Sequence, residues 1–219
     1  MNLSANRKIV FVAGIHGNER MPVKALTEAG KDFILGSPKA YEHNARFVEK
    51  DLNASFGVPP DSYESKRAEE ILQRINEEDL VVDFHTTESE HTPFVIIVDE
   101  KMIPLAERTG IERVVIMKHN IKRGHALINH RDGISIEAGA HTDQRSYNTT
   151  LDVINNINKK RKYPTHLYEV YGEITEPGEY INFQEHQAGF IPILANESEY
   201  ERQGLFGLKA RKLTDIICL

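Results

Sequence analysis

The sequence predicts an α/β fold, in which helices cover both faces of a mostly parallel or mixed β-sheet, followed by a small β-rich unit. Two observations lead to this prediction. Short runs of β-branched residues alternate with longer segments in which apolar residues recur at helical spacing. After about residue 162, proline and glycine become frequent and the helical spacing is lost. With 219 residues, 40% of them hydrophobic, the chain has enough apolar material for such a core.

The predicted strands are short apolar runs bounded by Gly, Pro, Asp or His, which is typical of buried strands. They are Ile9–Ala13, Leu80–Phe84, Phe94–Val98, Val114–Met117 and Ile134–Glu137. Two segments, Ser62–Asn76 and Asp143–Lys160, carry their apolar residues on one helical face. Strands that alternate with helices favour a sheet covered on both faces.

We predict two domains, at residues 1–162 and 163–219, with the boundary near the basic run Lys159–Lys162. The single cysteine, Cys218, cannot form an intramolecular disulfide, and no apolar run approaches the roughly 20 residues that span a bilayer. A soluble, cytoplasmic protein is therefore the expectation. The net charge of −6 gives no reason to expect a nucleic acid or an anionic membrane as partner. Assembly into a homo-oligomer is left open.

Two candidate metal ligands, His16 and Glu19, follow the first predicted strand. They lie in one turn, where Gly14 and Gly17 let the backbone bend without a side-chain clash. A third candidate, His85, follows the second predicted strand. Because sites in open α/β sheets gather at the carboxyl ends of strands, we expect the three side chains to meet. Two histidines and one glutamate, with a fourth position for water, form a catalytic zinc set.

Asp83, two residues before His85, is a candidate to orient a ligand imidazole from behind. Each part of this pattern alone is weak evidence for a metal site, because a histidine at a strand end is more often an ordinary polar residue than a ligand. The combination of a glycine-flanked turn with a second strand that ends in Asp-x-His-Thr favours one Zn²⁺ per chain. Co²⁺, Mn²⁺ or Ni²⁺ could occupy the same donors.

Several segments, in matching order along most of the chain, carry a resemblance to a known family. They are Gly14–Glu19, Arg46 with Asp51–Asn53, Asp83–Thr87, Gly133–Gly139 and, more faintly, Asn196–Glu201. In these segments the chain resembles the aspartoacylase and succinylglutamate desuccinylase group, which is related to the zinc carboxypeptidases. The resemblance implies a zinc-carboxypeptidase-type α/β sandwich, with a small β domain covering the active-site channel. It also implies hydrolysis of the amide bond of an N-acyl amino acid or a related small N-acyl amine.

Glu137 is an acid in an otherwise apolar, glycine-flanked strand end. Since burying an unpaired carboxylate costs several kcal/mol, such a residue needs a partner or a chemical role. A salt-bridged core acid and a general base both satisfy this requirement, and the resemblance implies the base. It also implies that Arg46 stabilises the oxyanion, although an isolated surface arginine is the simpler interpretation of that residue.

The pattern departs from the family at Ala54. Where these enzymes usually carry Asp-Leu-Asn-Arg, with Asn and Arg binding the substrate carboxylate, this chain has Asp51-Leu52-Asn53-Ala54. Asn53 remains a candidate substrate-binding residue. Ala54, however, lacks the guanidinium fork of an arginine, which would bind the substrate carboxylate through two hydrogen bonds. An acidic N-acyl amino acid is therefore not secured as the substrate. The arginines that could replace the missing fork are Arg20, Arg67, Arg131 and Arg145.

In the C-terminal unit, Glu197 and Tyr200 match the Glu and Tyr that the family places near its substrate, although ordinary turn residues would look the same. The other histidines are interpreted as surface or loop residues, with His91 a weaker candidate for the same pocket.

Two alternative functions stay open. A carboxypeptidase acting on peptide termini needs an Arg for the terminal carboxylate, which Ala54 argues against. A non-catalytic metal-binding relative is disfavoured because all three ligands and Glu137 are present.

Overall fold

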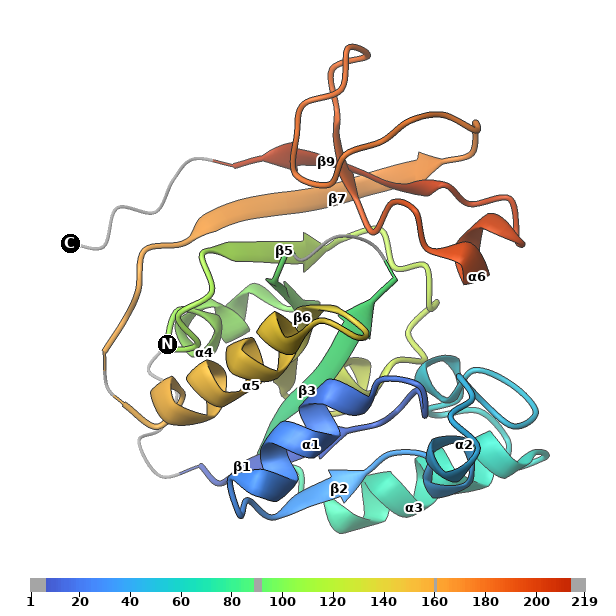
Figure 1. Cartoon of the computed structure of the whole chain (residues 1–219), viewed down its shortest axis with the longest axis vertical. Coiled ribbons are helices and arrows are strands. Elements are labelled where there is room, and N and C mark those ends of the chain that lie inside the picture. The colour runs from blue at the N-terminus through green and yellow to red at the C-terminus, as the bar shows by residue number, and fades with distance from the viewer. Residues whose placement is uncertain (1–6, 89–91, 160, 214–219) are drawn as a thin grey trace.

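The computed structural model describes residues 7–88, 92–159 and 161–213, so that His91 and Cys218 lie outside the described residues. The strands form one sheet in the order β2-β1-β3-β6-β4-β5-β7-β9-β8 (Figure 1). Their bounds are β1 Ile9–Ala13, β2 Phe33–Leu35, β3 Leu80–Thr87, β4 Phe94–Ile97, β5 Arg113–Met117, β6 Gly133–Ala140, β7 His166–Ile174, β8 Ile191–Ile193 and β9 Gly207–Lys212. The helices are α1 Arg20–Glu28, α2 Pro38–Glu42, α3 Tyr63–Arg74, α4 Ile103–Ala106, α5 Gln144–Asn156 and α6 Ser198–Glu201.

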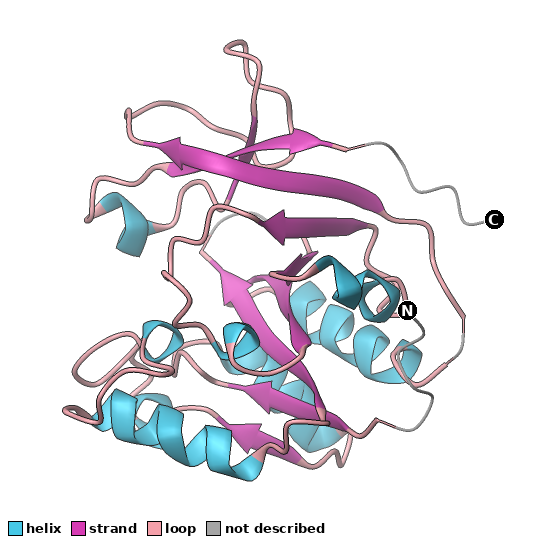
Figure 2. Cartoon of the chain, turned by 180° about the vertical axis from the view of Figure 1, so that it is seen from behind, coloured by secondary structure: helices cyan, strands magenta, loops and turns pink. Residues whose placement is uncertain are grey.

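Helices cover both faces of the sheet, as the sequence predicts. On one face, α1, α4 and α5 pack in a single apolar cluster with alternate residues of the strands (Figure 1). On the other face, α3 packs against β1 and β3 (Figure 2). Side chains of successive strand residues point to opposite faces, so β1 sends Phe11 to the first cluster and Val10 and Val12 to the second. The α/β class and the mixed sheet are thereby confirmed.

The arrangement of β1, β3 and β6 positions the site. These three neighbouring strands run parallel, with Ala13 opposite Phe84 and His85 opposite Glu137. Their carboxyl ends therefore share one edge of the sheet. The neighbour of β6 on its other side, β4, runs antiparallel and pairs Phe94 with Glu137. The candidate ligands and the candidate base thus come from adjacent strands.

The predicted strand boundaries at this edge were too short. Strand β3 continues through His85 to Thr87, and β6 continues through Glu137 to Ala140. The polar residues at the end of β3 are buried, and His85 and Thr87 still pair with Glu137 and Ala140 of β6 across a register shift, so the strand does not end where its apolar run ends. Helix α1, which directly follows Glu19, was not predicted, although Pro22 in its first turn is compatible with a helix start.

The residues after 162 extend the same sheet. Strand β7 pairs parallel with β5, and β9 and β8 follow it in antiparallel pairing. Helix α6 adds one turn, whose Glu197 cap reaches back toward the end of β3. The division into domains at 1–162 and 163–219 stays a prediction. Among the described residues, no helix has the length and apolar character needed to span a membrane.

Candidate metal centre and active site

His16, Glu19 and His85 come together as a buried cluster at the carboxyl ends of β1 and β3. One ligand atom from each of the three residues lies within 4.8 Å of the other two. The Nδ1 atom of His16 lies 2.7 Å from Glu19 Oε1, and the Nδ1 atom of His85 lies 3.2 Å from Glu19 Oε2. All three side chains are nearly inaccessible, at 4%, 1% and 2% exposed.

Two glycines permit the turn that holds His16 and Glu19. Gly14 has a φ of +70°, and a Cβ there would lie 2.8 Å from Leu35 Cδ1. At Gly17, a Cβ would lie 2.1 Å from the carbonyl carbon of Ala40, so only glycine lets α2 pass this closely. The Gly17 N–H donates to the Arg46 carbonyl at 3.2 Å, which fixes the segment after α2 beside the cluster.

Each imidazole of the cluster is held from behind by a carboxylate. Asp83 Oδ2 lies 2.7 Å from His85 Nε2, and Asp51 Oδ1 lies 3.0 Å from His16 Nε2. Asp83 and His85 share one face of β3 because they are two residues apart in a strand. A carboxylate on one ring nitrogen orients a histidine so that the other nitrogen faces a metal. The structure therefore places Asp83 where its predicted orienting role requires it.

The donor set fits a divalent ion. If Nε2 of each imidazole donates its hydrogen to the acid behind it, then Nδ1 presents a lone pair to Glu19. A lone pair facing a carboxylate needs a proton or a cation between the two. The Oε2 atom of Glu19 is buried and makes no well-formed hydrogen bond within the described chain. Two imidazoles and one carboxylate are the donors of catalytic zinc sites.

The charges of the metal-free cluster lead to the same conclusion. Burial lowers the pKa of His85, but Asp83 and Glu19 outweigh burial and hold it well above its usual value. Burial raises the pKa of Glu19, but His16 and His85 outweigh burial and hold it far below its usual range. The cluster thus stabilises positive charge next to the Glu19 carboxylate, which is the charge that a metal ion brings.

Glu137 lies on β6, directly opposite His85 on β3. Burial raises the pKa of its carboxyl to about 8; His85 and Arg46 oppose the shift, while Glu19 and Glu197 add to it. No hydrogen bond or ion pair to the Glu137 side chain occurs among the described residues, so a salt-bridged core acid is not what the structure places there. An acid of this kind, facing a cavity, is a candidate for proton transfer.

Two adjoining cavities surround the cluster. The first, of about 30 Å³, is lined by the three candidate ligands together with Arg46 and Glu197. The second, of about 50 Å³, lies toward the loop between β5 and β6. Both cavities are lined by Asn53, His85, Glu137, Leu194 and Tyr200. The second cavity thus adjoins the one that contains the cluster, with these five side chains between them.

The other predicted site residues also lie here. Asn53 has a buried Oδ1 atom with no hydrogen-bond partner among the described residues. Arg46 lies 3.9 Å from Asp51 Oδ2, and its Nε is buried and likewise without a partner there. Both oxygens of Glu197 accept the backbone N–H of Glu88, at 3.1 and 3.2 Å, which joins the C-terminal unit to the end of β3.

None of the four arginines considered for the missing fork lines either cavity. Arg20 stacks on Tyr41, and Arg145 pairs with Asp143. Arg67 and Arg131 donate to backbone carbonyls. The cation that does line the second cavity is Lys122, which the sequence interpretation did not consider.

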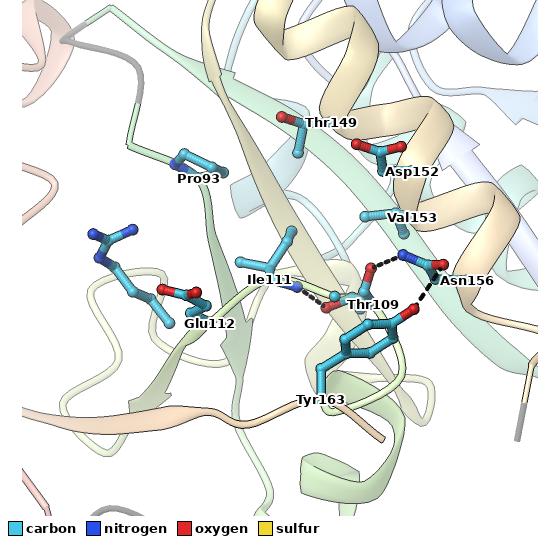
Figure 3. Close-up of a pocket in the computed structure, with 11 residues that line it drawn as sticks. Pro93, Thr109, Ile111, Glu112, Thr149, Asp152, Val153, Asn156 and Tyr163 are labelled. Atoms are coloured by element: carbon cyan, nitrogen blue, oxygen red, sulfur yellow. Dashed lines mark hydrogen bonds between the residues drawn. The ribbon is translucent and has the colours of Figure 1, made fainter. Parts of the chain in front are cut away.

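A third cavity, of about 310 Å³, lies apart from these, between α5 and the turn before β5 (Figure 3). Three hydrogen bonds join polar groups of its lining. Tyr163 donates to Asn156 at 3.1 Å, Asn156 donates to the Thr109 carbonyl at 3.2 Å, and the Ile111 N–H donates to the Thr109 hydroxyl at 3.1 Å (Figure 3). None of the predicted site residues lines this cavity, and we assign it no role in the chemistry.

The carboxylate behind His85 gives a test of the metal site. Asp83→Asn keeps the size of the side chain but removes its charge, so we expect zinc affinity to fall by about 10- to 100-fold. Competition with a chromogenic chelator measures this affinity. Asp99→Asn, at an exposed position, is the control and should bind zinc like the unaltered protein. Equal affinities in all three proteins would show that Asp83 does not support a metal ligand.

Comparison with known proteins connects this site to a family. A profile of the succinylglutamate desuccinylase/aspartoacylase catalytic domain matches residues 5–158. A probable aspartoacylase of Prochlorococcus marinus subsp. pastoris is 31% identical over 114 residues, which are 44% of this chain and 39% of that protein. An N-acyl-aromatic-L-amino acid amidohydrolase (carboxylate-forming) of Xenopus laevis is 26% identical over 213 residues, or 75% of this chain and 69% of that protein. The chain thus spans about two fifths of the first relative.

Solved structures show the same fold. Murine aminoacylase 3 superposes with a TM-score of 0.73 at 16% identity, covering 97% of this chain and 98% of that one. The succinylglutamate desuccinylase of Chromobacterium violaceum superposes with a TM-score of 0.71 at 16% identity, covering 97% of this chain and 88% of that one. At this level of identity, the similarity establishes the fold alone.

Proposed function

The chain belongs to the succinylglutamate desuccinylase/aspartoacylase catalytic-domain family, and we propose that it hydrolyses the amide bond of an N-acyl amino acid or a related small N-acyl amine with one zinc ion per chain. The observation that carries this proposal is the buried cluster of His16, Glu19 and His85 beside Glu137. The three ligands match those of catalytic zinc sites. The Glu137 side chain beside them has no hydrogen-bond or ion-pair partner among the described residues.

His16, Glu19 and His85 are the residues that would hold the ion. When bound, zinc lowers the pKa of a coordinated water to about 7, polarises the substrate carbonyl, and by its charge favours the ionised form of the neighbouring Glu137 carboxyl. Asp51 and Asp83 keep the two imidazoles oriented by accepting the hydrogen on Nε2 of each ring.

Glu137 would move the proton. Its carboxylate accepts a proton from the attacking water as the new C–O bond forms at the carbonyl carbon. It then donates that proton to the amide nitrogen as the C–N bond breaks, so that an amine leaves and a carboxylic acid remains. Arg46, whose buried Nε has no partner within the described chain, would donate to the carbonyl oxygen, on which negative charge develops.

The size of the site favours small substrates over peptides. The two adjoining cavities measure about 30 and 50 Å³, and Tyr200 and Glu197 of the C-terminal unit line the space beside the cluster. Asn53 lines both cavities. It would form a hydrogen bond to the part of the substrate that lies between the substrate's carboxylate and its amide group. A carboxypeptidase acting on long peptides would need a more open cleft.

Amine release from a panel of N-acyl amino acids tests the proposal. The panel spans acidic, neutral and basic amino acids with acetyl and succinyl groups, and zinc-loaded protein is compared with chelator-stripped protein. We expect turnover that the chelator abolishes and that added zinc restores. Equal turnover in the stripped protein, or none on any member, would contradict the proposal.

A further inference from the structure

We propose that Lys122 binds the substrate carboxylate and that the apolar wall beside it takes an uncharged side chain, so that the substrate is an N-acyl derivative of a small neutral, apolar amino acid. This inference rests on the proposed function and deepens it by naming the substrate class. It goes beyond the sequence interpretation, which considered only arginines for the missing fork at Ala54.

Lys122 lies in the loop between β5 and β6, and its side chain is 15% exposed. Its Nζ atom lies 2.7 Å from Asp51 Oδ2 and 5.1 Å from the centre of the Tyr200 ring. Asp51 caps the single turn Leu52–Ala54. The ammonium group is thus held beside the turn where the family pattern has an arginine.

The ammonium group keeps donors for a ligand. An ammonium has three N–H donors, and Asp51 is its one hydrogen-bond acceptor among the described residues. Asp51 is also shared, because His16 Nε2 lies 3.0 Å and Arg46 3.9 Å from its carboxylate oxygens. Lys122 and Arg46 therefore share the Asp51 carboxylate, which engages only part of the hydrogen-bonding capacity of the ammonium group and leaves donors for an anion in the cavity.

The pKa values agree with this charge distribution. Burial lowers the pKa of Lys122, but Tyr200 and Asp51 outweigh burial and raise it above its usual value. Burial raises the pKa of Asp51, but His16, Lys122 and Arg46 outweigh burial and hold it well below its usual range. Lys122 is therefore charged throughout the pH range in which a substrate carboxylate is ionised.

Apart from Lys122 and the residues that both cavities share, most residues that line the second cavity are apolar, the exceptions being Ser135, Asn120 and Asn129. Its hydrocarbon wall consists of Ile96, Val98, Met117, Ile121, Ile128 and Leu194. The two loop amides there bond within the loop, since Asn120 Nδ2 donates to Asn129 Oδ1 and Asn120 Oδ1 accepts the Lys122 backbone N–H. A second carboxylate, as in an N-acyl aspartate, would lie against this hydrocarbon wall, where the lining offers no cation besides Lys122 and His85 to compensate its charge, and this is costly.

The same cavity leads to the chemistry. Asn53, His85 and Glu137 line it from the other side. An N-acyl amino acid has its carboxylate one carbon away from the amide nitrogen. Since Lys122 and Glu137 line the same cavity, such a molecule would place its carboxylate at Lys122 and its amide toward Glu137. A volume of about 50 Å³, against roughly 10–15 Å³ for one water, limits the side chain to about three to five heavy atoms, a range that includes leucine.

Lys122→Met, which keeps the hydrocarbon stem and removes the charge, tests the inference. For N-acetyl-L-leucine we expect KM to rise about 10- to 100-fold, with kcat within about threefold of the unaltered protein. The preference for N-acetyl-L-leucine over N-acetyl-L-leucinamide should disappear. In a separate calorimetric measurement, which needs no turnover, the Kd of L-leucine for the zinc-loaded protein should rise by a similar factor.

Lys122→Arg keeps the charge and should retain most of the binding, and Lys118→Met, at an exposed lysine paired with Glu100, should behave like the unaltered protein. Zinc content is measured in every variant.

Unchanged KM and Kd in Lys122→Met would overturn the inference. A loss of zinc that parallels the rise in KM would also overturn it, because Lys122 would then only support Asp51. Turnover of acidic substrates alone would overturn it while upholding the proposed function. Weakened L-leucine binding without turnover of any substrate would uphold it and refute the proposed function.

Discussion

Glu137→Gln is expected to lower kcat by about 10²- to 10⁴-fold, because the amide keeps the shape of the side chain but cannot accept the proton of the attacking water. Since Glu137 is not among the candidate ligands, zinc content should stay at one per chain. Steady-state kinetics on the best substrate of the panel, with zinc measured by mass spectrometry, give both quantities. Glu112→Gln, at an exposed position before β5, is the matched control. A kcat within fivefold of the unaltered protein would remove Glu137 from the mechanism.

The same substitution has an expected effect on stability. In the metal-free protein, burial raises the pKa of Glu137 from 4.5 to about 8. Between these values the folded state binds more protons than the unfolded state, so stability falls as pH rises. Because glutamine does not titrate, Glu137→Gln removes this loss of stability at high pH. At pH 8 the chelated variant should melt higher than the unaltered protein by at least about 2–4 °C, the shift expected for 1 kcal/mol in a chain of this size. At pH 4.5 the difference should vanish.

His85→Ala is expected to abolish zinc retention and, with it, turnover. Removing a ligand should weaken zinc binding by more than the roughly 10- to 100-fold expected for loss of the carboxylate behind it. Zinc is measured after dialysis against a weak chelator, and turnover is measured on the same samples. His119→Ala, at an exposed histidine paired with Glu173, should retain full zinc.

Because His85→Ala leaves the buried Asp83 without its imidazole partner and Glu19 with His16 alone, a second variant guards against simple unfolding. Glu19→Gln keeps the side-chain volume and the fold but replaces a charged ligand by a neutral amide. It too should lose zinc, with far-ultraviolet circular dichroism unchanged. Full zinc occupancy in either variant would contradict the ligand set.

The parts of the site that were visible in the sequence are those set by local spacing. His16 and Glu19 share one turn, and Asp83 and His85 share one face of a strand, so each pair could be identified from neighbouring letters. Glu137 was conspicuous as an acid within an apolar run. That these residues share one edge follows from the parallel pairing of β1, β3 and β6.

The contacts that escaped prediction join distant segments. Asp51 reaches His16, and Lys122 reaches Asp51, across loops that have no periodicity to indicate where they fold. No spacing rule connects a loop lysine to a turn far earlier in the chain. The strand ends were also underestimated, because burial at this edge comes from polar residues such as His85 and Thr87. Apolar patterning therefore locates the sheet but not the residues that complete its site.

The measurement that tests the central claim most directly is a zinc titration of the chelator-stripped protein, with the initial rate of amide hydrolysis as the readout. If His16, Glu19 and His85 hold one catalytic ion, the rate should rise linearly from near zero and level off at one zinc per chain. Full activity in the stripped protein, or a rate that does not respond to added zinc, would contradict the account.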